Sequence, residues 1–176
     1  MNSICFKKTA DSWREALPIG NGRLGAMISG GQKKEVIQLN QDSIWYGSPI
    51  NRINPEAKEH LSRIRSLIQE GRIPEAEKLM TYTLSGIPQS QRPYQTLGNI
   101  ELTYYSQKGD VTGYHRRLDL DDGEVTESYQ LHNNDNSIHI YKEYLASYPH
   151  GILAFHFCSS EGTISFDAIL RRGRFY

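Results

Sequence analysis

The sequence predicts a mainly β protein, an antiparallel β-sandwich with a helical hairpin inserted around residues 55–84. Two observations carry this prediction. From Ile100 onward, apolar and polar residues alternate in short runs separated by turn formers, which is the pattern of half-buried strands. Between residues 55 and 84 the apolar residues recur at helical spacing instead. A chain of 176 residues has room for one such domain, residues 1–176.

The first part of the chain predicts three short strands. Residues 3–9 can form the first of them. Leu24–Ile28 and Val36–Leu39 are apolar runs too brief for helices and are bounded by turn residues, so they predict strand, turn and strand. The pairs Asn21-Gly22 and Gly30-Gly31 supply the positive φ values that tight turns require.

The same region contains a glycine motif that resembles a nucleotide-binding fingerprint. Residues 20–25 spell G-x-G-x-x-G, and Asp42 lies near the position of a ribose-binding acid. A dinucleotide site needs a strand before these glycines and a helix after them. Pro18 interrupts any ladder before Gly20, and only residues 26–29 separate the motif from the next glycine pair. The glycines therefore predict turns, and we expect no cofactor.

Two helices are predicted between the strands. Asn54-Pro55-Glu56 is a strong helix start, because Asn caps, Pro suits the first helical position and an acid favours the first turn. Gly71 ends this helix, Pro74 opens a second, and the second stops near Ser85-Gly86. We expect this hairpin to pack on a sheet or at its end. The side chains expected to face inward are Ala57, Leu61, Ile64, Ile68, Ala76, Leu79, Met80 and Thr83.

The remainder of the chain predicts a meander of strands with short turns between them. The predicted strands are Ile100–Tyr104, Tyr114–Leu120, Val125–Leu131, Ile138–Tyr141, Ile152–Phe157 and Ile164–Leu170.

Residues of catalytic type are present, but their context favours structural roles. The carboxylates between residues 119 and 127 could supply a general acid and base, yet Asp121-Asp122-Gly123 is typical of a turn in which Asp bonds its own backbone. No Ser lies in a G-x-S-x-G elbow. The sequence therefore predicts no catalytic residue. The carboxylates considered are Asp119, Asp121, Asp122, Glu124 and Glu127.

Metal and disulfide chemistry find equally little support. His132, Asp135 and His139 are of metal-ligating type, but an Asn-rich turn separates them and a structural or exposed role is favoured. Cys5 and Cys158 lie far apart and outside any C-x-x-C pattern, which is typical of small buried thiols. We expect no metal site.

The segment from Asn40 to Trp45 is the best candidate for ligand contact. An aromatic plate beside amide and carboxylate groups suits a sugar ring, whose C–H groups stack while its hydroxyls are hydrogen-bonded. The alternative is that Asn40 and Asp42 cap turns and Trp45 fills the core beneath the helices. The same two interpretations apply to Arg23, Tyr94 and Gln95, which complete the predicted site.

Several motifs together resemble glycoside hydrolase family 95, the alpha-L-fucosidases. The resemblance covers nearly the whole chain in the family's order, and Gln41 stands where that family more often has Glu. The matching stretches are Trp13 with Ala16–Met27, Ile37–Gly47, Asn54–Ala57, Ile64–Gly71, Tyr94–Asn99 with Leu102, Arg117–Leu120 and Tyr144–Pro149.

This resemblance implies an N-terminal β-sandwich of the super-sandwich type, incomplete at its C-terminal end, that packs against and supports a catalytic (α/α)6 barrel. The barrel of such enzymes supplies the groups for an inverting hydrolysis and is absent from this chain, so no catalytic residue can be carried over and the chain alone is expected to be inactive. A fucosylated glycan is an implied partner. The alternatives are a free-standing carbohydrate-binding module or the N-terminal domain of a related (α/α)6 glycosidase or phosphorylase.

Charge and termini lead to expectations about partners and location. The chain has 20 Lys plus Arg and 20 Asp plus Glu, so it has no net charge that would attract nucleic acid or an anionic membrane.

No segment is long enough to span a membrane, and the N-terminus lacks the order of a signal peptide. A native Met1 implies a cytoplasmic protein, and a removed signal implies a secreted or periplasmic one. An exposed docking face and an open sheet edge predict self-association.

Overall fold

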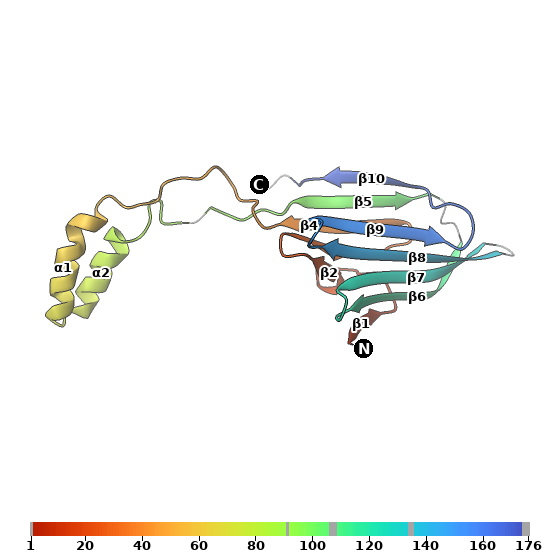
Figure 1. Ribbon diagram of the computed structural model, residues 1–176, viewed down its shortest axis with the longest axis horizontal. Coiled ribbons are helices and arrows are strands. Elements are labelled where there is room, and N and C mark those ends of the chain that lie inside the picture. Colours follow the sequence, from red (N-terminus) through yellow and green to blue (C-terminus); the bar gives the residue numbers. More distant parts are fainter. Residues whose placement is uncertain (1, 91, 106–108, 134–135, 174–176) are drawn as a thin grey trace. The chain divides into compact units, whose positions relative to one another are not determined.

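The computed structural model confirms a mainly antiparallel β architecture with two helices (Figure 1). It describes residues 2–90, 92–105, 109–133 and 136–173. The chain divides into two compact units. One contains residues 1–44 and 96–176, and the other contains residues 45–95.

The first unit is a sandwich of two five-stranded antiparallel sheets. One sheet has the strand order β1-β6-β7-β8-β9, and the other has the order β10-β5-β4-β3-β2 (Figure 1). The strands are β1 (Ser3–Phe6), β2 (Leu17–Gly20), β3 (Leu24–Ile28), β4 (Lys34–Gln41), β5 (Gly98–Tyr104), β6 (Asp110–Asp119), β7 (Glu124–Asn133), β8 (Asn136–Ser147), β9 (Ile152–Ser159) and β10 (Phe166–Arg171).

The core lies between these sheets and follows from the period-two alternation of the sequence. In β4, residues 35, 37 and 39 are buried while residues 34, 36, 38 and 40 are exposed. Ile28 and Ile37 stand directly opposite each other on β3 and β4, and both are fully buried. Such cross-strand pairs are the unit by which a half-buried sheet is stabilised.

The prediction that the glycines of residues 20–25 form turns is confirmed for Gly22 but not for Gly20 and Gly25, which pair with each other in β2 and β3. One step of the sequence argument was also wrong. Gly22 has a φ of 88° in the turn between β2 and β3, and a strand rather than a helix follows. However, Pro18 does not interrupt a ladder, because it lies within β2 and pairs with Met27. β2 is the edge strand of its sheet, and an edge position tolerates a residue without a backbone N–H.

Strand lengths were underestimated where a polar residue occupies a core position. The sequence predicted a strand over residues 138–141, but β8 runs from Asn136 to Ser147. Lys142 lies in its middle and is fully buried, so the apolar alternation is broken at a position that faces the core. Its charge is balanced by partners on other strands, which no local pattern can reveal.

The second unit contains two helices, α1 (Ala57–Gln69) and α2 (Ile73–Thr83), as predicted. Gly71 has a φ of 75°, and the backbone N–H groups of Gly71 and Arg72 donate to the carbonyls of Ile68 and Leu67. This is the glycine-ended helix terminus that the sequence indicated.

The buried face of the helices matches the expected one at Ile64, Ala76 and Thr83 but differs elsewhere. Leu67 is buried with Ile64, whereas Leu61 and Ile68 are 38 % and 47 % exposed and Met80 is 38 % exposed. Two helices in contact bury only a narrow stripe of each other, and this stripe includes residue 67 instead of residues 61 and 68. Whether the hairpin packs on a sheet stays a prediction.

Asn54 connects the two ends of this helical unit. Its side-chain oxygen accepts from the Glu56 N–H at 3.0 Å, and its amide donates to the carbonyls of Tyr82 at 3.1 Å and Ser85 at 3.3 Å. We expect Asn54→Ala to destabilise the unit by about 2 kcal/mol, since a helix-start hydrogen bond and two partly buried ones are lost. Hydrogen exchange of α1 and α2 amides measures this. Asn51→Ala, which removes a single exposed bond to Ile53 N–H, is the control and should change exchange little.

Candidate functional site

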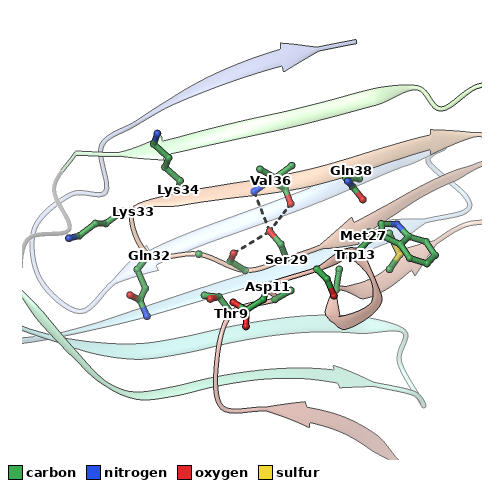
Figure 2. Close-up of a pocket in the computed structure, with 15 residues that line it drawn as sticks. Thr9, Asp11, Trp13, Met27, Ser29, Gln32, Lys33, Lys34, Val36 and Gln38 are labelled. Carbon is green, nitrogen blue, oxygen red and sulfur yellow. Dashed lines mark hydrogen bonds between the residues drawn. The ribbon is translucent and has the colours of Figure 1, made fainter. Parts of the chain in front are cut away.

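The outer face of the β2–β3–β4–β5–β10 sheet carries two adjoining pockets. The first has a volume of about 640 Å³ and is lined by residues of the loop before β2 together with β3, β4 and the turn that joins them. Figure 2 shows Trp13 and Met27 at one end of this pocket and Lys33 and Lys34 at the other. Ser29 lies at its floor, where its hydroxyl donates to the Val36 carbonyl at 2.7 Å.

The second pocket has a volume of about 720 Å³ and shares Trp13, Met27 and Gln38 with the first. Its further lining comes from outward positions of the same sheet, including Asn40 of β4 and Asn99 of β5. Gln38 and Asn99 stand opposite each other in the register of these strands. The two pockets therefore adjoin each other beside Trp13.

The Trp13 loop is held in place from inside the sandwich. Trp13–Glu15 forms one turn of 3-10 helix, and Trp13 is 61 % exposed. The fully buried guanidinium of Arg116 donates to the carbonyls of Glu15 and Ile28, both at 2.9 Å. One buried side chain thus fixes the loop to β3, and with it the position of the exposed tryptophan.

The six residues predicted as a site divide between the two units. In the sandwich, Arg23, Asn40 and Asp42 lie where β3 begins and β4 ends, at the end of this hairpin that is opposite its turn. There the Asp42 N–H donates to the Arg23 carbonyl at 3.0 Å. The Gln41 amide donates to the Asp42 carboxylate at 3.0 Å, so Asp42 has a turn-stabilising contact. Asn40 lines the 720 Å³ pocket.

In residues 45–95, the structure brings Trp45 and Tyr94 together. They form an isolated antiparallel bridge, and their rings meet edge to face with centroids 5.1 Å apart. Trp45 is 44 % exposed, so it does not fill a core beneath the helices. Gln95 follows directly at the end of this unit.

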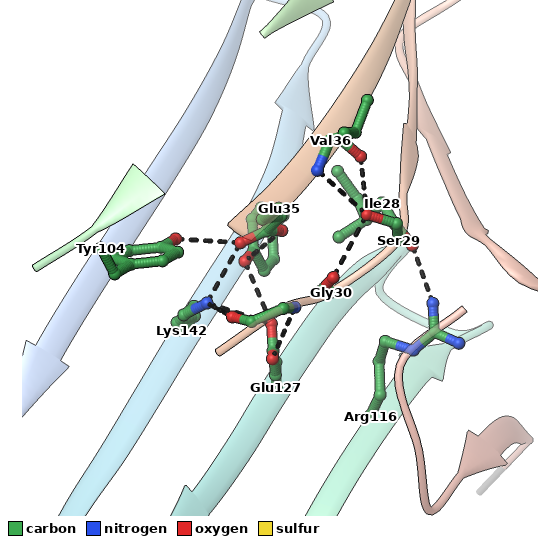
Figure 3. Close-up of polar contacts among 11 residues, drawn as sticks. Ile28, Ser29, Gly30, Glu35, Val36, Tyr104, Arg116, Glu127 and Lys142 are labelled. Carbon is green, nitrogen blue, oxygen red and sulfur yellow. Dashed lines mark hydrogen bonds and ion pairs between the residues drawn. The ribbon is translucent and has the colours of Figure 1, made fainter. Parts of the chain in front are cut away.

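A network of charges lies fully buried between the sheets (Figure 3). The Lys142 ammonium donates to the Gly31 carbonyl at 2.6 Å and pairs with Glu35 at 3.1 Å and with Glu127 at 3.4 Å. Glu127 also accepts from the Gly31 N–H at 3.0 Å. Lys142 and Glu127 come from one sheet and Glu35 from the other, so the network ties the two layers together.

Two tyrosines complete the network. Tyr104 donates to Glu35 at 2.9 Å, and Tyr144 donates to Glu35 at 2.7 Å and to Glu127 at 3.3 Å. Burial, reinforced by the two carboxylates, raises the pKa of both hydroxyls well above the ordinary value, so they remain donors. Groups sealed in this way cannot reach a substrate, and their role is structural.

Burial also raises the pKa of the Glu127 carboxyl to about 7, against the opposing effect of Lys142. The unfolded chain loses this proton near 4.5, so the folded state binds more protons between pH 4.5 and 7. We therefore expect the free energy of unfolding to fall by about 3 kcal/mol as pH rises through this window. Urea unfolding at a series of pH values measures the slope. Glu127→Gln should flatten it, and an unchanged slope in that variant would contradict the assignment.

The other chemistry-bearing residues singled out from the sequence stay dispersed. Residues 120–123 form a turn, in which Gly123 has a φ of 69°. Of the five carboxylates considered, Glu127 alone is buried, which the sequence did not reveal. His132 bonds the Thr112 hydroxyl at 2.7 Å, and Asp135 lies outside the described residues.

The described residues contain neither a metal-binding cluster nor a membrane-spanning helix. No group of three or more His, Cys, Asp or Glu side chains in the part of the chain that the structure covers could hold a metal ion. Neither α1 nor α2, the helices within the described ranges, is long and apolar enough to cross a membrane.

Sequence reasoning did not single out Trp13, Met27, Gln38 or Asn99 as residues of a site. A polar residue at an outward strand position is ordinary, so Gln38 and Asn99 carry no local signal. They come together because β4 pairs with β5 across the 45–95 insertion.

Comparison with known proteins identifies the family. A family model described as "Glycosyl hydrolase family 65, N-terminal domain" matches residues 4–174. The chain is 36% identical over 166 residues to Alpha-L-fucosidase 2 of Arabidopsis thaliana and 33% identical over 153 residues to Probable alpha-fucosidase A of Aspergillus niger. These matches cover 93% and 82% of this chain but only 19% and 18% of the relatives, so the chain spans about a fifth of their length. The resemblance to fucosidases is confirmed, and the chain belongs to the glycosyl hydrolase family 65 N-terminal domain family, as an N-terminal domain of the fucosidase-like kind.

Proposed function

We propose that this chain is the non-catalytic N-terminal sandwich of a longer alpha-L-fucosidase, and that it supports a catalytic (α/α)6 barrel that hydrolyses fucosylated glycans with inversion. The observation that carries the proposal is the family match over residues 4–174 in a chain that spans about a fifth of the fucosidases it resembles. Most of such an enzyme lies outside this domain, and the chemistry is assigned to that part.

The carboxylates of the sandwich support a non-catalytic role. An inverting glycosidase needs two carboxyl groups on an open cleft, far enough apart to admit sugar and water. Glu127, whose pKa suits a general acid, and its neighbour Glu35 are instead closed off in the network around Lys142. A carboxyl group with no access to solvent cannot protonate a glycosidic oxygen.

The helical unit supplies a surface suited to contact with the barrel. Large apolar side chains are exposed at many positions along residues 45–95, and their burial against a partner would be favourable. They are Trp45, Tyr46, Ile50, Ile53, Leu61, Ile68, Ile73, Met80, Tyr82, Leu84, Ile87 and Tyr94.

Activity measurements test the supporting role. The purified chain alone should release no fucose from 2′-fucosyllactose. In Alpha-L-fucosidase 2 of Arabidopsis thaliana, deletion of the matching region should abolish hydrolysis, and replacement by this chain should restore part of it. NMR of the first product should show the anomer opposite to that of the substrate. Fucose release by the isolated chain, or a chimera no better than the deletion, would overturn the proposal.

A second candidate is the N-terminal domain of a related barrel enzyme such as a phosphorylase. The description of the matching family model, which names family 65, favours it. The two candidates differ in product, since phosphorolysis needs inorganic phosphate and yields a sugar phosphate, whereas hydrolysis yields the free sugar. Phosphate dependence of the longer protein proposed to carry this domain, measured with its own barrel, decides between them.

We also propose that the isolated chain self-associates. β9 and β10 end their sheets, so each presents an unpaired edge. Leu170 of β10 is 73 % exposed and stands opposite the partly buried Ile100 in register, so the edge strand carries exposed apolar surface. Light scattering should detect dimers or larger species that Leu170→Lys reduces. A monomer at high concentration would contradict this.

A further inference from the structure

The 720 Å³ pocket on the outer face of the β2–β5 and β10 sheet is lined in part by a residue without a side chain, Gly25. Gly20 of β2 and Gly25 of β3 face each other in register, next to Asn40 of β4. A Cβ atom at Gly25 would come no closer than 3.6 Å to the Ile19 carbonyl oxygen and 4.0 Å to the Asn40 Cβ. Gly25 lines the pocket and leaves space beside Asn40 because it carries no side chain, although its φ value does not require glycine.

The lining of the pocket combines apolar side chains with neutral amides. Trp13, Pro18 and Met27 supply the apolar side chains, and Gln38 and Asn99 lie among the polar ones. None of the described residues that line it carries a charge. The adjoining 640 Å³ pocket differs in this respect, since Asp11, Lys33 and Lys34 line it.

This composition selects one class of ligand. An exposed indole beside carboxamides suits a pyranose ring, whose C–H face stacks on the aromatic plane while its hydroxyls exchange hydrogen bonds with amides. An anionic ligand would find no cation among the described residues that line the pocket. A purely apolar ligand would leave the amides of Gln38 and Asn99 without solvent or partner. A volume of about 720 Å³ lies within the range of small-molecule sites and admits one or two sugar rings.

We propose that this pocket binds a neutral saccharide, with one ring on Trp13 and its hydroxyls hydrogen-bonded to Gln38 and Asn99. The site lies in the sandwich and differs from the aromatic pair of Trp45 and Tyr94 in the other unit. It goes beyond the supporting role, because a domain that supports a barrel needs no saccharide site of its own. Arg116 acts as a positioning residue, since it holds the loop that carries Trp13.

Titration of the isolated 176-residue chain tests the site without any catalytic activity. The probes are L-fucose and 2′-fucosyllactose, with the anionic N-acetylneuraminic acid as the ligand control. We expect saturable NMR shifts or heats with the neutral sugars and none with the acid. Trp13→Ala should weaken binding about tenfold or more, because the stacking surface is lost. Gly25→Val should abolish binding, because its side chain fills the hollow.

Matched variants keep the result interpretable. Trp45→Ala, which removes an exposed tryptophan in the other unit, should leave affinity unchanged, and circular dichroism should show that each variant is folded. The proposal is overturned if wild-type chain shows no saturable binding, or if affinity falls with Trp45→Ala and survives Trp13→Ala and Gly25→Val. It is also overturned if Trp13→Ala and Gly25→Val leave sugar binding intact yet lower the activity of the chimera. In that case the pocket would be a contact surface for the catalytic domain and not a sugar site.

Discussion

Lys142→Met is expected to destabilise the sandwich by about 3–5 kcal/mol. The substitution keeps the length of the side chain but removes the single ammonium that pairs with both Glu35 and Glu127. All three side chains are fully buried, so the two carboxylates would be left in a dry environment without their counter-charge. Urea unfolding followed by far-UV circular dichroism measures the loss.

A triple variant separates the charge effect from packing. If Glu35→Gln and Glu127→Gln accompany Lys142→Met, no unpaired charge remains, and the triple variant should be more stable than Lys142→Met alone. Lys34→Met, at an exposed position of β4, should change stability little. A Lys142→Met protein as stable as the wild type would show that the network does not hold the two sheets together.

Gly30→Ala is the second substitution with a large expected effect, about 2–5 kcal/mol. Gly30 has a φ of 70°, which is costly for alanine. The added Cβ would also overlap the Tyr114 hydroxyl and lie 3.0 Å from the Arg116 Cδ. Thermal and urea unfolding of the variant measure the sum of the strain and the overlap.

Gly123→Ala is a matched control for backbone strain. Its φ of 69° is nearly the same, but nothing lies within 4 Å of the added Cβ, so its cost should be limited to about 1–2 kcal/mol. Tyr114→Phe combined with Gly30→Ala removes the overlapping hydroxyl and should recover part of the difference. If Gly30→Ala and Gly123→Ala lower the free energy of unfolding equally, the side chains around Gly30 move to accommodate the added Cβ, and the predicted overlap has no effect on stability.

The fold class and most element positions were predictable from local patterns. The helix end at Gly71 and the hairpin turn at Gly22 follow from one residue each, because only glycine readily takes a positive φ at such turns. The predicted strand boundaries were wrong where a residue that is unusual in a strand is tolerated because of its tertiary surroundings. Pro18 is accepted because β2 is an edge strand, and β8 continues through Lys142 because two carboxylates balance its charge.

Short-range periodicity was sufficient to establish a β-sandwich with a helical hairpin, since alternation and helical spacing report which face of each element avoids water. Only the tertiary structure decided which side chains meet. Glu35, Glu127 and Lys142 become one buried cluster, and Trp13, Gln38 and Asn99 line one pocket, through pairing between strands far apart in the chain. Strand order and register are collective properties of the sheets, and no single stretch of sequence carries them.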